Sequence, residues 1–284
     1  MPRGILCLAV CAQLAGADLQ RAVDQAMSQR QGAVVVLDVE SGRILASHRL
    51  EYAARRLARP GSTVKPFTLL ALLNEGRVKT GTALVCGRRL RIDGRRLDCT
   101  HPITPLPLEA TAAIAYSCNY FFATLAAGLR DGDLAGTFGR VGLASLSGLT
   151  RNEVAGAVRP AAGAAQRQLQ ALGEAHVEVT PLGLAAAYRK LAQRRNLKGD
   201  WDAGMEIIYE GLKAATSYGT ARLAQPAGLR VAGKTGSSSG QAWFAGFAPA
   251  DAPRITVVVF LEQGTGGADA APVARRIFEG IIAP

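Results

Sequence analysis

The sequence predicts an α/β (α+β) fold in which both ends of the chain build one antiparallel sheet and a mainly helical lobe lies between them. Strand-like composition occurs over residues 33–47 and again after residue 229, whereas residues 68–219 are rich in Ala and Leu at helical spacing. The chain has 284 residues, of which 49% are hydrophobic and 19% charged, so it can bury a large core. Strands at both ends are joined most economically in a single sheet covered by the terminal helices.

The N-terminus has the layout of a secretory signal peptide over residues 1–17. Arg3 precedes an uncharged apolar stretch from Gly4 to Ala17, which ends in the small residues of an A-x-A cleavage site. The alternative is a buried N-terminal helix, and the stretch is too short to span a bilayer comfortably. We therefore expect an exported protein of the periplasm or cell envelope.

The elements of the sheet and its terminal helices follow from local periodicity. Apolar residues at i, i+3 and i+4 spacing predict an amphipathic helix over residues 19–27, which ends by Gly32. Residues 33–39 and 43–47 are expected to form a hairpin across the turn at 40–42. Three later strands and a closing amphipathic helix are predicted over 229–235, 242–247, 255–261 and 273–282.

The middle of the chain is predicted to be a helical lobe interrupted by a loop from Cys86 to Pro107. One of its helices should start after Thr180-Pro181, because Thr caps helices and Pro suits the first helical turn. A site is expected where the two lobes meet. The predicted catalytic domain, residues 18–284, divides into a sheet lobe, 18–67 with 220–284, and a helical lobe, 68–219.

The formal net charge of +11 suits an anionic partner, either nucleic acid or the surface of a cell wall or membrane. Basic platforms interleaved with aromatic residues are missing from the sequence, so we expect no nucleic acid partner. The arginines at 88–91 and 95–96 predict a solvated hairpin, and the alternative is a patch that holds an anionic polymer.

Five cysteines and three histidines bear on redox chemistry and metals. Cleavage after Ala17 would remove two cysteines and keep Cys86, Cys99 and Cys118, and export would permit a disulfide between Cys86 and Cys99. The cysteines and histidines lack metal-ligand spacing, so we expect neither a metal nor a cofactor. The histidines read as isolated surface or core residues: His48, His101 and His176.

A serine and a lysine lie one helical turn apart in the stretch Gly61-Ser62-Thr63-Val64-Lys65-Pro66-Phe67. The apolar run that follows predicts a helix, and a proline in the opening turn places its start near Ser62. Ser62 and Lys65 then share one face of the first turn. Two further short motifs occur later in the chain: Ser117-Cys118-Asn119 and Lys234-Thr235-Gly236-Ser237.

Ser-x-x-Lys, Ser-x-Asn and Lys-Thr-Gly, in this order, resemble the motif set of penicillin-binding proteins and serine β-lactamases. The resemblance covers nearly the whole mature chain and implies a β-lactamase/transpeptidase-like fold. Further stretches that look like this family's transpeptidase domains are 32–46, 59–62, 179–185, 218–221 and 242–249.

The chemistry requires these residue types. A serine hydroxyl needs a base within hydrogen-bond reach, and Lys65 can act only when neutral, so desolvation and the charge of Lys234 must depress its pKa. Ser62 would attack a carbonyl to give an acyl-enzyme. The resemblance implies that the backbone N–H groups of Ser62 and Ser237 stabilise the oxyanion.

The remaining roles come from the resemblance. Ser117 would relay a proton to the leaving amine, and Asn119 would orient Lys65 and bind the substrate amide. Lys234 and Thr235 would bind the terminal carboxylate of a D-Ala-D-Ala stem peptide of peptidoglycan or of a covalently inhibiting β-lactam. Gly236 would let the substrate lie along the strand.

Each motif residue also has an ordinary structural interpretation. Ser62 alone could be a helix cap, Lys234 a solvated charge at a strand end, and Asn119 a turn residue. Their occurrence in one order favours function. Cys118 is the exception, because we expect its small apolar side chain to point away from the site. Ser237 stands where the family's transpeptidases usually have Thr, and it keeps a hydroxyl.

Three functions are compatible with the motifs. The preferred one is a D,D-transpeptidase or D,D-carboxypeptidase, which differ in whether an amine or water accepts the acyl group. A serine β-lactamase is less favoured, because the sequence lacks the Glu-x-x-x-Asn segment of class A enzymes after the second motif. A β-lactam or muropeptide sensor that acylates without turnover usually needs a membrane-spanning partner domain, which this sequence does not contain.

Overall fold

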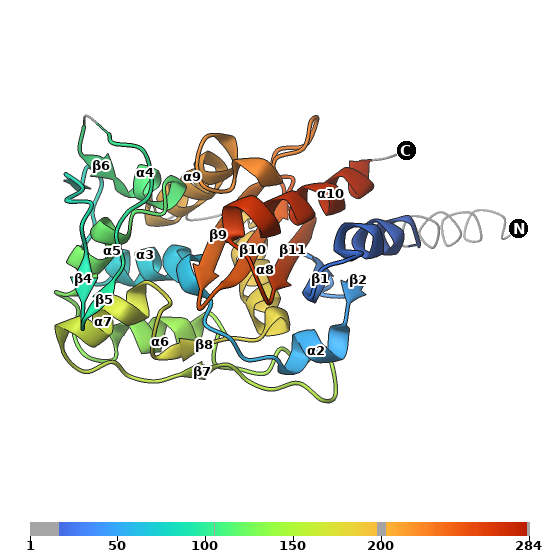
Figure 1. Cartoon of the computed structure of the whole chain (residues 1–284), viewed down its shortest axis with the longest axis horizontal. Helices are drawn as coiled ribbons and strands as arrows, with labels where there is room; N and C mark the ends of the chain where they lie inside the picture. The colour runs from blue at the N-terminus through green and yellow to red at the C-terminus, as the bar shows by residue number, and fades with distance from the viewer. Residues whose placement is uncertain (1–16, 105, 198–202, 283–284) are drawn as a thin grey trace, which may run out of the picture.

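The computed structural model of the chain describes residues 17–104, 106–197 and 203–282 (Figure 1). The predicted leader lies outside these residues apart from Ala17. Within the described ranges, none of the helices is both long and apolar enough to cross a membrane.

One five-stranded antiparallel sheet joins the two ends of the chain, as predicted. Its strand order is β2-β1-β11-β10-β9, so the N-terminal hairpin pairs with the C-terminal strands through β1 and β11. The five strands are β1 (Gly32–Asp38), β2 (Ile44–His48), β9 (Ala232–Ser238), β10 (Gln241–Ala248) and β11 (Ile255–Leu261).

Both faces of the sheet are buried, which explains why β1 and β11 are apolar at nearly every position. Alternate residues face opposite sides, so Val34 and Val36 enter a core different from that of Val35 and Leu37. The helix over residues 17–27 and α10 (Ala271–Ile282) cover one face (Figure 1).

The other face packs against α8 (Pro181–Asn196) and the helical lobe. Helix α8 begins where predicted, because the Thr180 side chain caps it by accepting from the N–H of Gly183 at 3.0 Å. Although α8 falls within residues 68–219, its packing belongs to the sheet. A strict division into two lobes at residues 68 and 219 therefore does not follow the packing.

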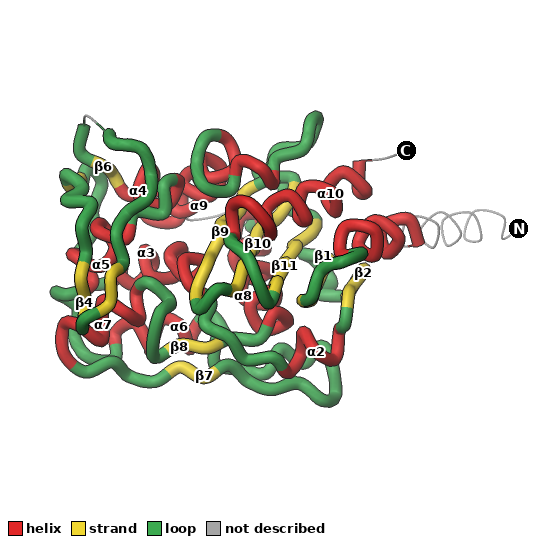
Figure 2. Tube along the Cα trace, in the orientation of Figure 1, coloured by secondary structure: helices red, strands yellow, loops and turns green. Residues whose placement is uncertain are grey.

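The helical lobe also contains three short two-stranded sheets (Figure 2). Its strands are β3 (Ala83–Leu84), β4 (Arg91–Ile92), β5 (Arg95–Arg96), β6 (Leu108–Glu109), β7 (Ala157–Val158) and β8 (Val177–Glu178). The hairpin predicted from the arginine run is the β4–β5 pair. The other helices are α2 (Leu50–Arg55), η1 (Gly61–Val64), α3 (Lys65–Asn74), α4 (Ala110–Ala115), α5 (Asn119–Ala126), α6 (Asp133–Arg140), α7 (Gly163–Ala171), α9 (Ala203–Ser217), η2 (Arg222–Ala224) and η3 (Gly266–Ala270).

Candidate active site

Ser62 lies in the 3₁₀ turn η1, which continues directly into α3 at Lys65. The helical path therefore starts where the proline indicated, with Pro66 in the first turn of α3. Ser62 is half-buried. Its Oγ has no hydrogen-bond partner among the described residues, Lys65 included, so the hydroxyl is free to meet an incoming group.

Two hydrogen bonds from distant segments and one within the turn fix the backbone around Ser62. The Tyr188 hydroxyl on α8 donates to the carbonyl of Thr63 at 2.8 Å, and the indole Nε1 of Trp243 on β10 donates to the carbonyl of Arg59 at 3.1 Å. The Thr63 hydroxyl donates to the carbonyl of Pro60 at 2.8 Å. Sheet and helix α8 thus hold the turn from both sides.

Close backbone approach brings β9 against this turn. A Cβ on Gly236 would lie 2.5 Å from the carbonyl oxygen of Pro60, and one on Gly61 would lie 2.6 Å from that of Ser237. Gly61 also has a φ of 51°, the left-handed region that favours glycine. The two glycines therefore let the backbones at Ser62 and Ser237 come together, as an oxyanion site requires.

The amine of Lys65 joins the first motif to the second. Nζ donates to the carbonyl of Ser117 at 2.7 Å, to Oγ of Ser117 at 3.1 Å and to Oδ1 of Asn119 at 2.6 Å. Ser117 takes a φ of 56°, which is uncommon for a residue with a Cβ and presents its carbonyl and hydroxyl to the same amine. Lys65 is completely buried.

Burial disfavours the charged form of both lysines in the site. It lowers the pKa of Lys65 to about 8, against smaller opposing effects of Cys118, Cys99 and Glu174. Burial also places the pKa of Lys234 well below its usual value, and the nearby charge of Lys65 lowers it further. Desolvation is therefore the dominant cause of the low pKa of Lys65, and the predicted contribution of Lys234 is not among the effects that lower it.

The third motif lies along β9. Lys234 is completely buried, and its Nζ donates to the carbonyl of Thr235 at 3.0 Å. The Thr235 hydroxyl donates to Oγ1 of Thr220 at 2.9 Å, and Ser237 is exposed. Thr220 belongs to a stretch that the sequence resemblance identified only as a spacer.

Strand β9 is an edge of the five-stranded sheet. An edge strand has one row of backbone N–H and C=O groups that no neighbouring strand pairs. An extended peptide can add to such an edge as a further strand. The geometry of β9 thus fits the expected mode of substrate binding.

Glu174 is a polar residue near the site that the sequence analysis missed. Its carboxylate accepts from Arg95 at 2.6 Å and from the Ser238 hydroxyl at 3.1 Å. Arg95 belongs to the basic hairpin, which was predicted to be solvated. Through Glu174 it instead connects the hairpin to β9. The spacing of Glu174 to the three motifs carries no signal that would have identified it.

The prediction that the histidines are isolated is wrong for His101. Cys86, Cys99, His101 and Cys118 place one ligand atom each within 4.8 Å of the others. The three cysteines are free thiols, so the disulfide that export would permit between Cys86 and Cys99 does not form in this structure. Folding brings these four residues together, although they are too far apart in the sequence to suggest a site.

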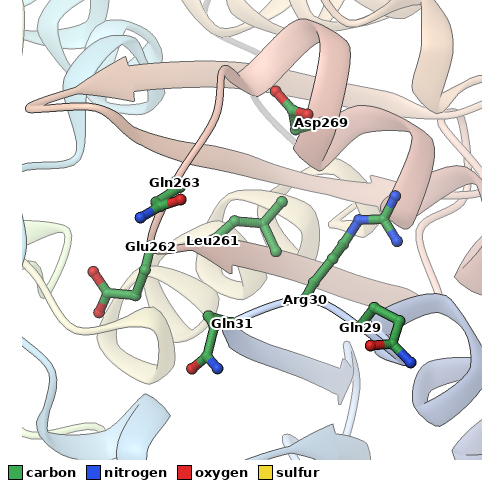
Figure 3. A pocket seen from close by; sticks show the side chains of 7 residues that line it. All are labelled: Gln29, Arg30, Gln31, Leu261, Glu262, Gln263 and Asp269. Atoms are coloured by element: carbon green, nitrogen blue, oxygen red, sulfur yellow. The ribbon is translucent and has the colours of Figure 1, made fainter.

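A separate surface hollow of about 370 Å³ lies at the end of β11 (Figure 3). The Glu262 carboxylate on its rim accepts from Nε of Arg56 at 2.7 Å and from the Gln241 amide at 2.9 Å. The hollow contains none of the motif residues, so we do not assign it to the active site. It is lined by Gln29, Arg30, Gln31, Leu261, Glu262, Gln263 and Asp269.

Comparison with known proteins gives a family and a fold. The family model described as the penicillin binding protein transpeptidase domain matches residues 32–279. Peptidoglycan D,D-transpeptidase PbpA of Mycobacterium tuberculosis is 27% identical over 332 residues, which cover 89% of this chain and 67% of the relative. Peptidoglycan D,D-transpeptidase MrdA of Haemophilus influenzae is 32% identical over 100 residues, covering 28% of this chain and 15% of the relative.

Solved structures share the fold at lower identity. Pseudomonas aeruginosa PBP2, solved in complex with WCK 5153, superposes with a TM-score of 0.81 at 23% identity, covering 94% of this chain and 77% of that one. The transpeptidase domain of Burkholderia pseudomallei penicillin-binding protein 3 gives a TM-score of 0.78 at 23% identity, covering 95% and 93%. The predicted fold class is confirmed.

Proposed function

Because the chain belongs to the penicillin-binding protein transpeptidase domain family, we propose that it is a peptidoglycan D,D-transpeptidase that works through an acyl-enzyme on Ser62. The observation that carries the proposal is the position of the Lys65 amine. It is buried, has a lowered pKa, lies one helical turn from Ser62 and is hydrogen-bonded to both polar residues of the second motif.

Acylation starts with attack of the Ser62 hydroxyl on the carbonyl between the two D-Ala residues of a stem peptide. The hydroxyl proton passes to neutral Lys65, and the backbone N–H groups of Ser62 and Ser237 stabilise the oxyanion. Ser117, whose Oγ lies 3.1 Å from the Lys65 amine, then passes a proton to the departing D-Ala amine. The C–N bond breaks, and the peptide remains as an ester of Ser62.

The substrate lies along the edge of β9 that no other strand of the sheet pairs, at the exposed Ser237. The hydroxyls of Thr235 and Ser237 receive the terminal carboxylate, supported by Lys234 behind them. Burial lowers the pKa of Lys234 and so favours its neutral amine. A bound carboxylate would favour the ammonium form, because opposite charges attract. A β-lactam carboxylate would occupy the same place.

Deacylation transfers the peptide to an acceptor. An amine from a second stem peptide gives a cross-link, and water gives the carboxypeptidase product. Mass spectrometry of the products from a pentapeptide muropeptide, with and without an added amine acceptor, measures the share of each. A product population made only of trimmed tetrapeptide would reassign the protein as a carboxypeptidase.

We place this activity at the cell envelope, with residues 1–17 as an export leader and residues 18–284 as the catalytic domain. The domain is built from a sheet lobe, 18–67 and 220–284 with α8 packed against its sheet, and a helical lobe formed by the rest of 68–219. The net charge of +11 supports contact with the anionic cell wall or membrane surface. Stem peptides are the natural partners and β-lactams the covalent inhibitors. N-terminal sequencing of the protein recovered from the envelope tests the cleavage after Ala17.

The test of the mechanism is covalent labelling by a fluorescent penicillin. Wild-type protein should take up the label stoichiometrically, whereas Ser62→Ala should take up none while keeping the wild-type thermal transition. Ser145→Ala, at an exposed serine outside the motifs, is the matched control and should label normally. Undiminished labelling of Ser62→Ala would exclude Ser62 as the nucleophile.

A further inference from the structure

Three cysteines and one histidine converge beside the second motif, and we propose that they form a tetrahedral Cys₃His site for a zinc ion. The residues are Cys86, Cys99, His101 and Cys118, whose ligand atoms all lie within 4.8 Å of one another. Cys99, His101 and Cys118 are buried and Cys86 is half-buried. Thiolate and imidazole ligands in this number are those of structural zinc sites.

The sulfur positions fit a metal better than a disulfide. Cys118 Sγ lies 3.7 Å from Cys99 Sγ and 3.5 Å from Cys86 Sγ. With Zn–S bonds of about 2.3 Å, a tetrahedral site separates its sulfurs by about 3.8 Å. A disulfide would need one pair at about 2.05 Å and would leave the third thiol unused.

His101 has the arrangement expected of a metal ligand. Its Nδ1 lies 2.8 Å from the carbonyl oxygen of Pro102, which can only accept, so Nδ1 carries the proton and Nε2 has the free lone pair. Nε2 is buried without a hydrogen-bond partner among the described residues, in a side chain only 5% exposed. A histidine that ligates through one nitrogen commonly donates the other to a backbone carbonyl.

Each sulfur also accepts a backbone N–H. Arg88 donates to Cys86 Sγ at 3.4 Å, Tyr120 donates to Cys99 Sγ at 3.3 Å, and Phe121 donates to Cys118 Sγ at 3.4 Å. Such donors stabilise thiolates, the form that binds metal. On binding, each thiol releases its proton to solvent, and three thiolates with one Zn²⁺ leave a net charge of −1.

The site would fasten the loop that contains the β4–β5 hairpin to the start of α5. This loop supplies the carbonyl of Leu97, which accepts from Nδ2 of Asn119 at 3.0 Å. The same Asn119 accepts from Lys65 through Oδ1. The metal therefore acts as a positioning element for the second motif, and it touches neither the substrate nor the reacting atoms.

The test measures metal on the intact protein, independently of acylation. Protein prepared under reducing conditions without a metal-affinity step should contain stoichiometric zinc by mass spectrometry of the element. Exchange with Co²⁺ should give the visible bands of tetrahedral cobalt and an intense thiolate-to-cobalt charge-transfer band. Absence of bound Zn²⁺ and Co²⁺ in reduced protein, or a disulfide among these cysteines in protein isolated without air, would refute the site.

Single-ligand variants decide the ligand set. Cys99→Ser and His101→Asn should lose stoichiometric zinc and the cobalt spectrum, whereas His176→Asn, the matched control, should keep both. Unchanged cobalt bands in His101→Asn would exclude the histidine as a ligand.

The positioning role has a separate readout, which rests on the proposed acylation. Removing zinc from wild-type protein should slow penicillin acylation by about tenfold, and adding zinc back should restore it. Chelation should leave the rate of a His101→Asn protein unchanged. Metal binding without any effect on acylation would leave the site structural only, contradicting the positioning role but not the proposed function.

Discussion

The amine of Lys65 lies 2.6 Å from Oδ1 of Asn119, and the other end of the same amide donates to the carbonyl of Leu97 at 3.0 Å. A single side chain therefore connects the buried base to the loop that carries Cys99 and His101. Because Oδ1 carries no formal charge, it orients the amine and favours its protonated form less than a carboxylate in the same place would.

Asn119→Asp should shift the pH dependence of acylation to higher pH. A carboxylate at this distance favours the ammonium form of Lys65 and should raise its pKa, so penicillin acylation falls at neutral pH and recovers at alkaline pH. Asn119→Ala is the comparison, because it removes the hydrogen bond and adds no charge. It should be slower at every pH without the shift, and identical profiles for the two variants would contradict this account.

Wild-type acylation should accelerate as the pH rises through about 8. Burial lowers the pKa of Lys65 to about 8, so the neutral, competent base is the minor form below that pH and the major form above it. Cys118, Cys99 and Glu174 oppose this shift, and Lys234 faces Lys65 from β9. Stopped-flow acylation with a chromogenic β-lactam measures the pH profile. The rate measured with Ser62→Ala gives the background hydrolysis by the buffer, which is subtracted.

The same lowered pKa affects stability. Unfolded Lys65, with its usual pKa of 10.5, binds a proton that the folded residue has released between about pH 8 and pH 10.5. The free energy of unfolding contributed by this group therefore rises with pH across that window and is lowest below pH 8.

For the acylation rate, a pH profile that stays flat from pH 6 to pH 9 would show that Lys65 is not the base.

Gly236→Ala should slow acylation by about 100-fold and destabilise the fold by about 1–3 kcal/mol. The new Cβ would lie 2.5 Å from the Pro60 carbonyl and 2.9 Å from Cγ2 of Thr63, so β9 must move away from the Ser62 turn. Gly139→Ala is the control, because that position on α6 is open and helical. It should be neutral or stabilising by up to about 1 kcal/mol, whereas normal acylation by Gly236→Ala would disprove the close-approach argument.

Local patterns predicted most of the architecture. Strand β11 occupies the predicted residues 255–261, and α8 begins after Thr180 because its cap and proline are adjacent in sequence. The sequence predicts that β9 starts at residue 229, but the strand starts at Ala232. The residues before Ala232 have strand-like composition but do not pair with β10.

The sequence is sufficient to predict the individual strands, the helices and the three motifs, because each depends on residues close together along the chain. The tertiary structure alone decided why Gly236 must be glycine, that Lys65 is fully buried against Asn119, that Glu174 and Arg95 bridge a hairpin to β9, and that four sulfur and nitrogen ligands meet beside Ser117. These features arise from contacts between segments tens of residues apart. Local periodicity carries no information about such distances, because they are fixed only when the elements pack.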